Sequence, residues 1–403
     1  MKSTDKISID KYSALRKGRS VIRNKVQTII KSVDACDPKR VVQKTAGNKK
    51  SLKKLGEGVY GIVYAGPVNK NRKEFVAIKM EKVNDNGLQH EYAMMKLLKH
   101  KGILVPSAYA LKKCSYGNIM YIEFANGGTL INFMDSILKN KSLDILVPYY
   151  FKIIITQVLF RLYEIQRKMP SFRHNDLHLD NIMISREGKK DGYTQYDIGR
   201  MKILRKNMGI VSYLSDFGFA NYSGLEQVDV VSGMHKEGYG IAKDSHPTYD
   251  AHFFLNCLYH KYINEPLFRG AKKFIEESFA PSYLKRDSVF VENFRLKYNR
   301  KHHLPSIERL FTHEYFIKKV ETKSLEIVKT LSPVVPARVM AKINKKVKEK
   351  YTINKDKELK IDRRKCRLYK KDELVKIAKK ENVYRNKMTK NLLCKALEKK
   401  YIK

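Results

Sequence analysis

Three glycines between two strand-like runs constrain the fold of this chain more than any other feature. From Leu52 the sequence reads LKKLGEGVYGIVYAG, in which Gly56, Gly58 and Gly61 interrupt an alternation of apolar and polar residues, and KEFVAIKM follows. Such alternation is typical of half-buried strands, and glycine lets a backbone turn tightly or approach another group closely. The pattern predicts a small sheet that begins near residue 52 and carries a glycine-rich turn.

Length and charge indicate several parts. At 403 residues the chain exceeds the usual size of one hydrophobic core, and 43% apolar residues are ample for burial. The net charge of +41 is concentrated near the ends, with 14 Lys/Arg against 4 Asp/Glu in residues 1–50 and 25 against 8 in residues 338–403. Such a charge attracts polyanions, including nucleic acid and acidic proteins, but does not determine a fold.

Cysteine usage and hydropathy indicate a compartment. The five cysteines are few, odd in number and scattered, which argues against a disulfide framework and favours a reducing compartment. The first twenty residues lack an apolar signal region, and the best apolar runs, such as residues 153–160, are shorter than a membrane span. We therefore expect an intracellular protein without a membrane segment.

Local patterns divide the rest of the chain. Residues 1–50 are a basic extension with weak helical periodicity, and apolar residues at helical spacing from Leu143 to Met169 predict a long buried helix. The polar stretch Arg186–Asn207 is predicted to be an insertion or long hairpin before the strand IVSYL. SPVVPAR and the Lys-rich run 342–360 indicate a linker.

The glycine-rich turn is followed by a lysine that could bind phosphate. Glycines in a hairpin are as often plain turn residues as phosphate-binding ones. However, VAIK ends at Lys79, on the strand expected to pair with the turn, where an ammonium can reach the α- and β-phosphates of a nucleotide. Glu91, in the helical pattern LQHEYAMMKLL, is the best candidate to orient it, whereas Glu81 is too close in sequence. The alternative for both side chains is simple solvation.

Two further motifs supply carboxylates and an amide. HNDLHLDN has the HxDxxxxN spacing, so Asp176 can accept a proton from an attacking hydroxyl and Asn181 can bind a metal ion. Asp180 is predicted to cap the turn instead. Asp216-Phe217-Gly218 follows an apolar strand, where a carboxylate suits Mg²⁺ that bridges phosphates. Each motif alone is weak, but four in one fixed order are not coincidence.

Together these residues resemble the eukaryotic protein kinase superfamily over residues 51–320. The resemblance implies an α+β bilobal fold with a β-rich N-lobe and a helical C-lobe. It also implies that Glu123 and Ala125 form the adenine-binding hinge beside Ile122, and that Asp250 anchors the catalytic loop. The implied ATP contacts are Gly56, Glu57, Gly58, Val59, Gly61, Val63, Ala77, Lys79, Glu123 and Ala125; the implied catalytic residues are Asp176, Lys79, Glu91 and His178; and the implied Mg²⁺ ligands are Asn181 and Asp216.

Departures from the family pattern bear on the substrate. Asn175 stands where many kinases have Arg, so we predict no need for phosphorylation of the activation loop. No APE sequence follows DFG, and His178 stands where Ser/Thr kinases usually have Lys, a form similar to haspin-like kinases and small-molecule phosphotransferases. VAIKME and the short interval from Lys79 to Glu91 resemble the casein kinase and vaccinia-related branch, which favours Ser/Thr.

The C-terminal residues 363–403 carry a second resemblance, after a basic linker at 321–362. Cys366 and Cys394 bracket two amphipathic patterns that resemble the two-cysteine adaptor domain of iridoviruses and related large DNA viruses, here expected to be a small helical module with packed thiols. KKDELVKIAKKENV also resembles a SAP-type DNA-binding helix pair, so the module is expected to bind protein partners or DNA.

The favoured interpretation is therefore a viral Ser/Thr protein kinase that uses ATP and Mg²⁺ and acts on protein substrates, with acidic and nucleic-acid-associated proteins as candidates. Its location would be the host cytoplasm, the nucleus or the virion. Two alternatives remain: a small-molecule phosphotransferase, and a pseudokinase that scaffolds partners through its basic termini.

Overall fold

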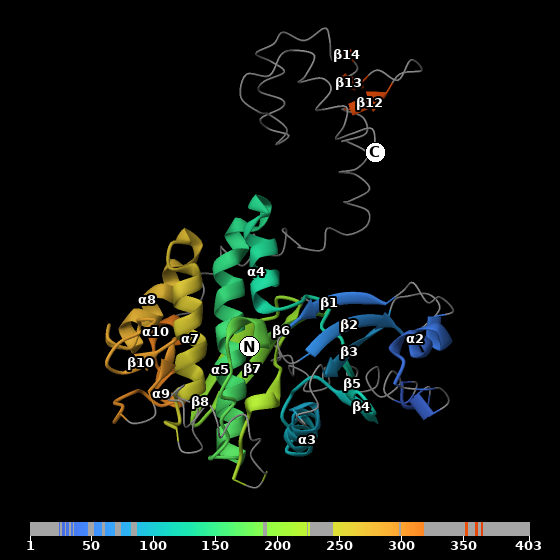
Figure 1. Cartoon of the computed structure of the whole chain (residues 1–403). Coiled ribbons are helices and arrows are strands. Elements are labelled where there is room, and N and C mark those ends of the chain that lie inside the picture. The colour runs from blue at the N-terminus through green and yellow to red at the C-terminus, as the bar shows by residue number, and fades with distance from the viewer. Residues whose placement is uncertain are drawn as a thin grey trace, which may run out of the picture. The chain divides into compact units, whose positions relative to one another are not determined.

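The structure of the protein is a computed structural model of the whole chain (Figure 1). It describes residues 24, 26–28, 30–31, 34, 36–46, 52–58, 61–68, 74–81, 87–187, 192–223, 225, 245–297, 300–317, 351–353, 359–361 and 364–365. The chain separates into two compact units, residues 1–319 and 320–403.

An antiparallel sheet forms the N-lobe, in the strand order β1-β2-β3-β5-β4 (Figure 1). The glycine-rich turn joins its first two strands, as predicted, and the register pairs Val63 with Lys79 and Lys79 with Met120. Lys79 therefore lies in the central strand, directly beside the turn. The elements are β1 (Lys53–Glu57), β2 (Gly61–Pro67), β3 (Phe75–Glu81), β4 (Ala108–Cys114), β5 (Gly117–Glu123) and the helix α3 (Gly87–His100).

The basic N-terminal region contributes to this lobe rather than standing apart as an extension. Val26, in a helical stretch, and Val41, in α2 (Pro38–Ala46), are 2% and 3% exposed and share one apolar cluster with Ile78, Tyr109 and the central strands. The weak helical periodicity of the sequence was thus a real signal. Burial of these valines, each contributing about 1.5–3 kcal/mol, explains why the segment packs on the sheet.

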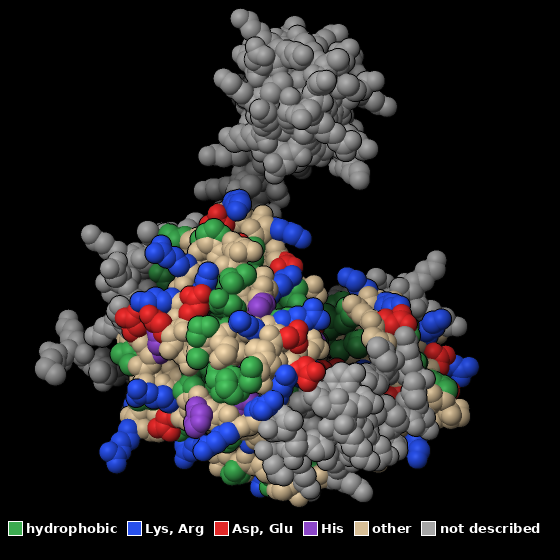
Figure 2. All heavy atoms as spheres, turned by 60° about the vertical axis from the view of Figure 1, so that its left-hand side comes forward, with side chains coloured by type: hydrophobic (Ala, Val, Ile, Leu, Met, Phe, Trp, Pro, Cys, Tyr) green, Lys and Arg blue, Asp and Glu red, His purple; other side chains and the backbone are tan. Residues whose placement is uncertain are grey.

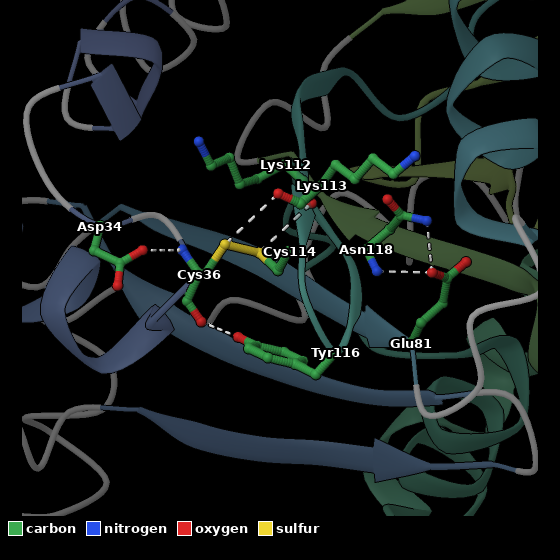
Figure 3. Close-up of a disulfide and its surroundings, with 8 residues drawn as sticks. All are labelled: Asp34, Cys36, Glu81, Lys112, Lys113, Cys114, Tyr116 and Asn118. Carbon is green, nitrogen blue, oxygen red and sulfur yellow. Dashed lines mark hydrogen bonds between the residues drawn. A yellow bond between two sulfur atoms is a disulfide. The ribbon is translucent and has the colours of Figure 1, made fainter.

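A disulfide joins the same region to the sheet and corrects the expectation that the scattered cysteines stay unpaired. Cys36, just before α2, bonds to Cys114 at the end of β4 (Figure 3). The Tyr116 hydroxyl donates to the carbonyl of Cys36, and the backbone N–H of Cys36 donates to Asp34 Oδ1 at 3.0 Å. The sequence could not show this pair, because 78 residues separate the two cysteines and only tertiary packing brings them together.

Helices form most of the second lobe. The predicted long helix is α5, which begins after a 3-10 turn (Lys141–Leu146) with Pro148 in its first turn and ends with Arg167 and Lys168, a favourable placement for the helix dipole. By length and hydropathy, an 18-residue window within Lys141–Lys168 could cross a membrane, but 56% of that window is buried inside the protein, as in a core helix. The helices are α4 (Leu130–Leu138), α5 (Val147–Lys168), α7 (Tyr249–Tyr262), α8 (Arg269–Ser278), α9 (Ile307–Leu310) and α10 (Glu314–Ile317).

Short antiparallel pairs complete this lobe. The predicted insertion is the hairpin of β7 and β8, in which Gly199 makes the turn with a φ of 57°. The strands on either side of this hairpin, β6 and β9, pair with each other. The pair β6-β9 joins the loop that contains Asp176 to the segment before Asp216. The pairs are β6 (Ile182–Arg186) with β9 (Ile210–Leu214), β7 (Tyr193–Ile198) with β8 (Met201–Lys206), and β10 (Val291–Glu292) with β11 (Arg295–Leu296).

The C-terminal unit departs from prediction where it is described. Residues Tyr351–Ile353 (β12), Leu359–Ile361 (β13) and Arg364–Lys365 (β14) form an antiparallel sheet, although most of them fall in the predicted linker. Short runs with β-branched and apolar residues explain β12 and β13, but not β14, which consists of Arg364 and Lys365. The predicted helical pair and its two cysteines, Cys366 and Cys394, lie outside the described residues.

Candidate active site

The N-lobe presents one buried lysine between two carboxylates. Lys79 Nζ lies 2.7 Å from Glu91 Oε2 and 2.8 Å from Asp216 Oδ1. Burial alone would lower the pKa of Lys79, but the charges of Asp216 and Glu91 outweigh it and raise that pKa. The lysine is therefore held as an ammonium, and the predicted partnership with Glu91 is confirmed.

Glu81, rejected as the partner of Lys79, has a different role. Its Oε1 accepts the backbone N–H of Leu88 at 2.7 Å, and its Oε2 accepts the backbone and side-chain N–H groups of Asn118, both at 2.7 Å. A carboxylate at the first turn of α3 satisfies N–H groups that have no partner within the helix. Glu81 thereby fixes the position of α3, and with it Glu91.

The glycine-rich turn leaves open space over the sheet. Near Gly56 and Gly58, an added Cβ would meet no atom within 4 Å, whereas at Gly61 it would lie 2.5 Å from the carbonyl oxygen of Met80. Gly61 is thus required for the packing of β2 on β3. The first two glycines leave room for a ligand, which suits a phosphate-binding loop. Val59, an expected contact, lies outside the described residues.

A buried aspartate shapes the catalytic loop, as predicted. Asp250, at the start of α7, accepts the backbone N–H groups of His174 at 2.8 Å and Asn175 at 2.9 Å. His174 Nε2 lies 3.0 Å from the carbonyl oxygen of Ser215. Asn175 adopts a φ of 66°, and its Nδ2 donates to the carbonyl oxygen of Phe219. These contacts link the loop to the residues on both sides of Asp216.

Asp176 lies at the centre of this loop. Asn181 Nδ2 donates to the backbone carbonyl of Asp176 at 2.7 Å and to its Oδ2 at 3.0 Å, and His178 Nε2 lies 3.5 Å from the same Oδ2. Burial opposes ionisation, but His178 and the charge of Arg295 together lower the pKa of Asp176. The carboxylate is therefore ionised and acts as an acceptor. The helical turn at 179–181 is capped by His178, not by Asp180 as predicted, because the His178 ring accepts the Asp180 N–H at 3.2 Å.

Arg295 is a functional contact that the sequence did not reveal. From β11, its guanidinium donates to Asp176 Oδ1 and to the carbonyl oxygen of Asn175, and it stacks 4.1 Å from the centre of the Phe253 ring. Only 13% of the Arg295 side chain is exposed. Because 119 residues separate Arg295 from Asp176, no local motif could have identified it.

Two oxygen donors fit a divalent cation. The amide nitrogen of Asn181 is used in the contacts to Asp176, which leaves its Oδ1 for a cation, and the Asp216 side chain is 46% exposed. The Ser215 N–H and hydroxyl both donate to the Asn181 carbonyl, at 2.9 and 3.0 Å. Because Ser215 precedes Asp216, these hydrogen bonds hold the backbones of the two predicted ligands, Asn181 and Asp216, next to each other. Carboxylate and amide oxygens are the ligands that Mg²⁺ prefers.

The remaining predicted nucleotide contacts surround the same region. Ala77 in β3 is 6% exposed, and Val63 in β2 is half-buried. Glu123 ends β5, where its carboxylate accepts the Ser107 N–H at 3.0 Å, and the chain then continues through Ala125 to α4 in the helical lobe. Glu57 instead pairs with Lys54 at the exposed end of β1.

The β-sheet lobe, the helical lobe and the side chains between them are arranged as in a protein kinase domain. Residues 50–235 match the protein kinase domain family. The chain is 28% identical over 157 residues to a protein of Acanthamoeba polyphaga mimivirus named provisionally as serine/threonine-protein kinase R400. The matched region covers 38% of this chain and 32% of that relative. It is 30% identical over 144 residues to the serine/threonine-protein kinase pakC of Dictyostelium discoideum, with 34% and 28% covered. The chain therefore spans about a third of the length of these relatives.

Proposed function

We propose that the protein transfers the γ-phosphoryl group of Mg·ATP to Ser or Thr hydroxyls of protein substrates. The observation that carries this proposal is the joint contact of Lys79 with Glu91 and Asp216, with Asp176 and Asn181 held in the adjoining loop. Further support comes from the kinase domain match and from two relatives named as Ser/Thr kinases.

Each side chain has a distinct task. Lys79 would bind the α- and β-phosphates, and Asn181 with Asp216 would hold Mg²⁺, which neutralises charge on the phosphates when bound. Asp176, ionised and fixed by Asn181, orients the attacking hydroxyl and accepts its proton. In-line transfer then depends mostly on positioning and charge neutralisation, since the protein makes no covalent bond.

Asp176→Asn tests this assignment. We expect phosphoryl transfer to fall by about 10²–10⁴, the usual contribution of a general base, while Mg·ATP binding persists. Asp180→Asn is the matched control, because Asp180 lies exposed in the same loop. Equal transfer by Asp176→Asn and the wild type would refute the mechanism, and absence of transfer by the wild type would favour the scaffold alternative.

One observation supports a second candidate, a small-molecule phosphotransferase. His178 Nε2 lies 3.5 Å from Asp176 Oδ2. Burial alone would lower the pKa of His178, but its hydrogen bond to Asp176 and the charge of that carboxylate outweigh burial, so the pKa is raised. This histidine adjoins Asp176, the group proposed to accept the proton of the attacking hydroxyl. Parallel assays with casein, basic proteins and a panel of hydroxylated metabolites separate the two acceptor classes.

We further infer that the C-terminal residues 363–403 form a two-cysteine adaptor module of the iridovirus type and that the chain comes from a large DNA virus. The mimivirus relative supports a viral source, and the motif around Cys366 and Cys394 supports the module. Protein partners are its proposed ligands, with DNA as the alternative. DNA binding by the full chain with six to ten phosphate contacts would weaken by roughly 10³–10⁵ between 50 and 200 mM salt.

An intracellular location is proposed on the ground that ATP is available there. The scattered cysteines no longer support it, because Cys36 and Cys114 are bonded. Among the described residues on the face shown in Figure 2, Lys and Arg side chains are interspersed with Asp and Glu. Fractionation of cells that produce the protein tests the location.

A further inference from the structure

A small basic cavity lies beside the catalytic loop and has no part in the chemistry described above. Its volume is about 180 Å³, and it is bordered by the first turn of α7 and the residues after β11. Of the described residues that line it, none is acidic. The polar lining side chains are Ser245, His246, Tyr249, Lys297, Arg300 and His302.

The formal charges on the described side chains that line this cavity are all positive. Lys297 and Arg300 contribute full charges to its lining. Arg173 lies beside it, because its Nε and Nη2 donate to the Ser245 carbonyl at 3.1 and 2.7 Å. Burial, then the neighbouring His302 and Arg173, lower the pKa of His246. A cavity with this lining favours an anion and disfavours a cation.

The cavity also contains a hydroxyl that lacks a partner. Ser245 is 8% exposed, and its Oγ makes no hydrogen bond with any described residue. A buried hydroxyl without a partner costs about 1–3 kcal/mol, so such a group commonly receives one from a ligand or water. Tyr249 begins α7, a 14-residue helix, and the positive end of the helix dipole therefore adds to the same field.

The position of the cavity connects it to substrate binding. Leu296 lines the cavity, and its neighbour Arg295 contacts Asp176. On the other side, Tyr249 lines the cavity, and its neighbour Asp250 holds the catalytic loop. A group bound here would lie within reach of a few extended peptide residues, each about 3.3 Å long, from the acceptor hydroxyl.

We propose that this cavity binds an anionic side chain, a phosphoryl or carboxylate group, of the protein substrate near the acceptor residue. The proposal rests on the proposed kinase function and specifies its substrate class: the protein prefers acidic or already phosphorylated sequences. An anion there pairs with Lys297 and Arg300 and accepts a hydrogen bond from Ser245. The same charges disfavour basic sequences.

A peptide set tests the proposal with phosphatase-treated full-length protein. Each peptide carries one Thr acceptor and neutral flanks, and either phosphoserine, Glu or Gln is moved along the flanking positions. We expect one position at which phosphoserine and Glu raise kcat/KM above Gln. We define the preference as the ratio of kcat/KM for the anionic peptide to that for the Gln peptide. In the double variant Lys297→Ala, Arg300→Ala this ratio should fall roughly 10-fold, and in either single variant about 5-fold. Turnover of the Gln peptide should be unchanged.

The matched control is Arg286→Ala, which removes an exposed arginine nearby in the chain but outside the cavity. The preference should survive this change. The proposal is overturned if the wild type does not prefer an anionic peptide, or if the double variant keeps the preference. It is also overturned if inorganic phosphate binds in a manner sensitive to the double variant while no peptide is preferred, because the cavity would then serve a free anion.

A binding assay separates this proposal from the kinase assignment. Fluorescence anisotropy with the same peptides, without ATP, measures occupancy of the cavity whether or not transfer occurs. Weaker binding of the phosphoserine peptide to the double variant than to the wild type supports the cavity even if no phosphate is transferred. Equal binding to the two proteins overturns it even if the protein is an active kinase.

Discussion

Replacement of Arg295 by alanine tests the contact that joins β11 to the catalytic loop. The guanidinium donates to Asp176 and to the carbonyl of Asn175, and the exposed fractions of the Arg295 and Asp176 side chains are only 13% and 19%. Solvent therefore screens this pair less than a surface ion pair. If the arginine fixes the orientation of Asp176, its removal should slow the chemical step.

The size of the effect follows from the interaction lost. Hydrogen bonds to charged groups contribute about 1.5–3 kcal/mol, and each 1.36 kcal/mol of lost transition-state stabilisation lowers the rate about tenfold. We therefore expect kcat to fall about 10- to 100-fold in Arg295→Ala, with KM for ATP nearly unchanged. Arg295→Lys keeps the charge but lacks the two separate nitrogens that donate to Asn175 and Asp176, so its loss should be intermediate.

The pH dependence distinguishes positioning of Asp176 from a general loss of structure. Arg295 helps to lower the pKa of Asp176, so its removal should raise that pKa. Because the ionised carboxylate is the active form, the acidic limb of the kcat profile should move to higher pH. Steady-state kinetics across pH, with thermal unfolding as a check on folding, measure this.

Arg286, which lies near Arg295 in the chain, provides the control variant. Arg286→Ala removes an arginine that is 69% exposed, pairs with the exposed Asp287 and lies over the Phe294 ring. Because Arg286 is not among the described contacts of Asp176, kcat of this variant should equal that of the wild type. The reasoning is refuted if folded Arg295→Ala retains kcat within twofold of the wild type with an unshifted pH profile.

Three further changes probe the scaffold. Gly61→Ala should lower the free energy of unfolding by about 1–3 kcal/mol and raise KM for ATP, because the new Cβ would lie 2.5 Å from the Met80 carbonyl. Cys114→Ser should lower the free energy of unfolding of the oxidised protein by about 2–4 kcal/mol, because the bond to Cys36 closes a loop of 78 residues. His252, buried with a pKa lowered to about 4 mainly by burial, should make the wild type lose up to about 3 kcal/mol of stability as pH falls from 6.5 to 4.

Denaturant unfolding checks these three predictions against matched controls. Gly58→Ala should leave the free energy of unfolding unchanged, since its Cβ would meet nothing within 4 Å, and equal destabilisation by both glycine variants would contradict the packing argument. Under reducing conditions Cys114→Ser and the wild type should be equally stable. For His252, the histidine must charge when unfolded but stays neutral when folded, so His252→Gln should lose less stability than the wild type between pH 6.5 and 4. The remaining loss comes from His174 and His246, whose pKa values are also lowered, mainly by burial; identical pH curves would contradict the prediction.

The local chemistry of the site was determined by the sequence. The glycine-rich turn, Lys79, Asp176 and Asp216 each sit in a short pattern whose spacing reflects one strand, loop or turn, and their order follows the order of the elements. Such patterns can be recognised in the sequence because strand alternation, helical periodicity and turn chemistry depend on residues that are close together in the chain. The long buried helix and the hairpin at 193–206 were predictable for the same reason.

The tertiary structure alone decided the contacts between distant segments. Arg295 reaches Asp176, Cys36 reaches Cys114, and Val26 packs on the sheet although its region is dominated by charge. No short pattern encodes these contacts, because they arise from how whole elements bury their apolar faces against one another. The sequence thus specified which groups can perform phosphoryl transfer, whereas the packing of the lobes decided what holds them in place and placed a cationic cavity at their side.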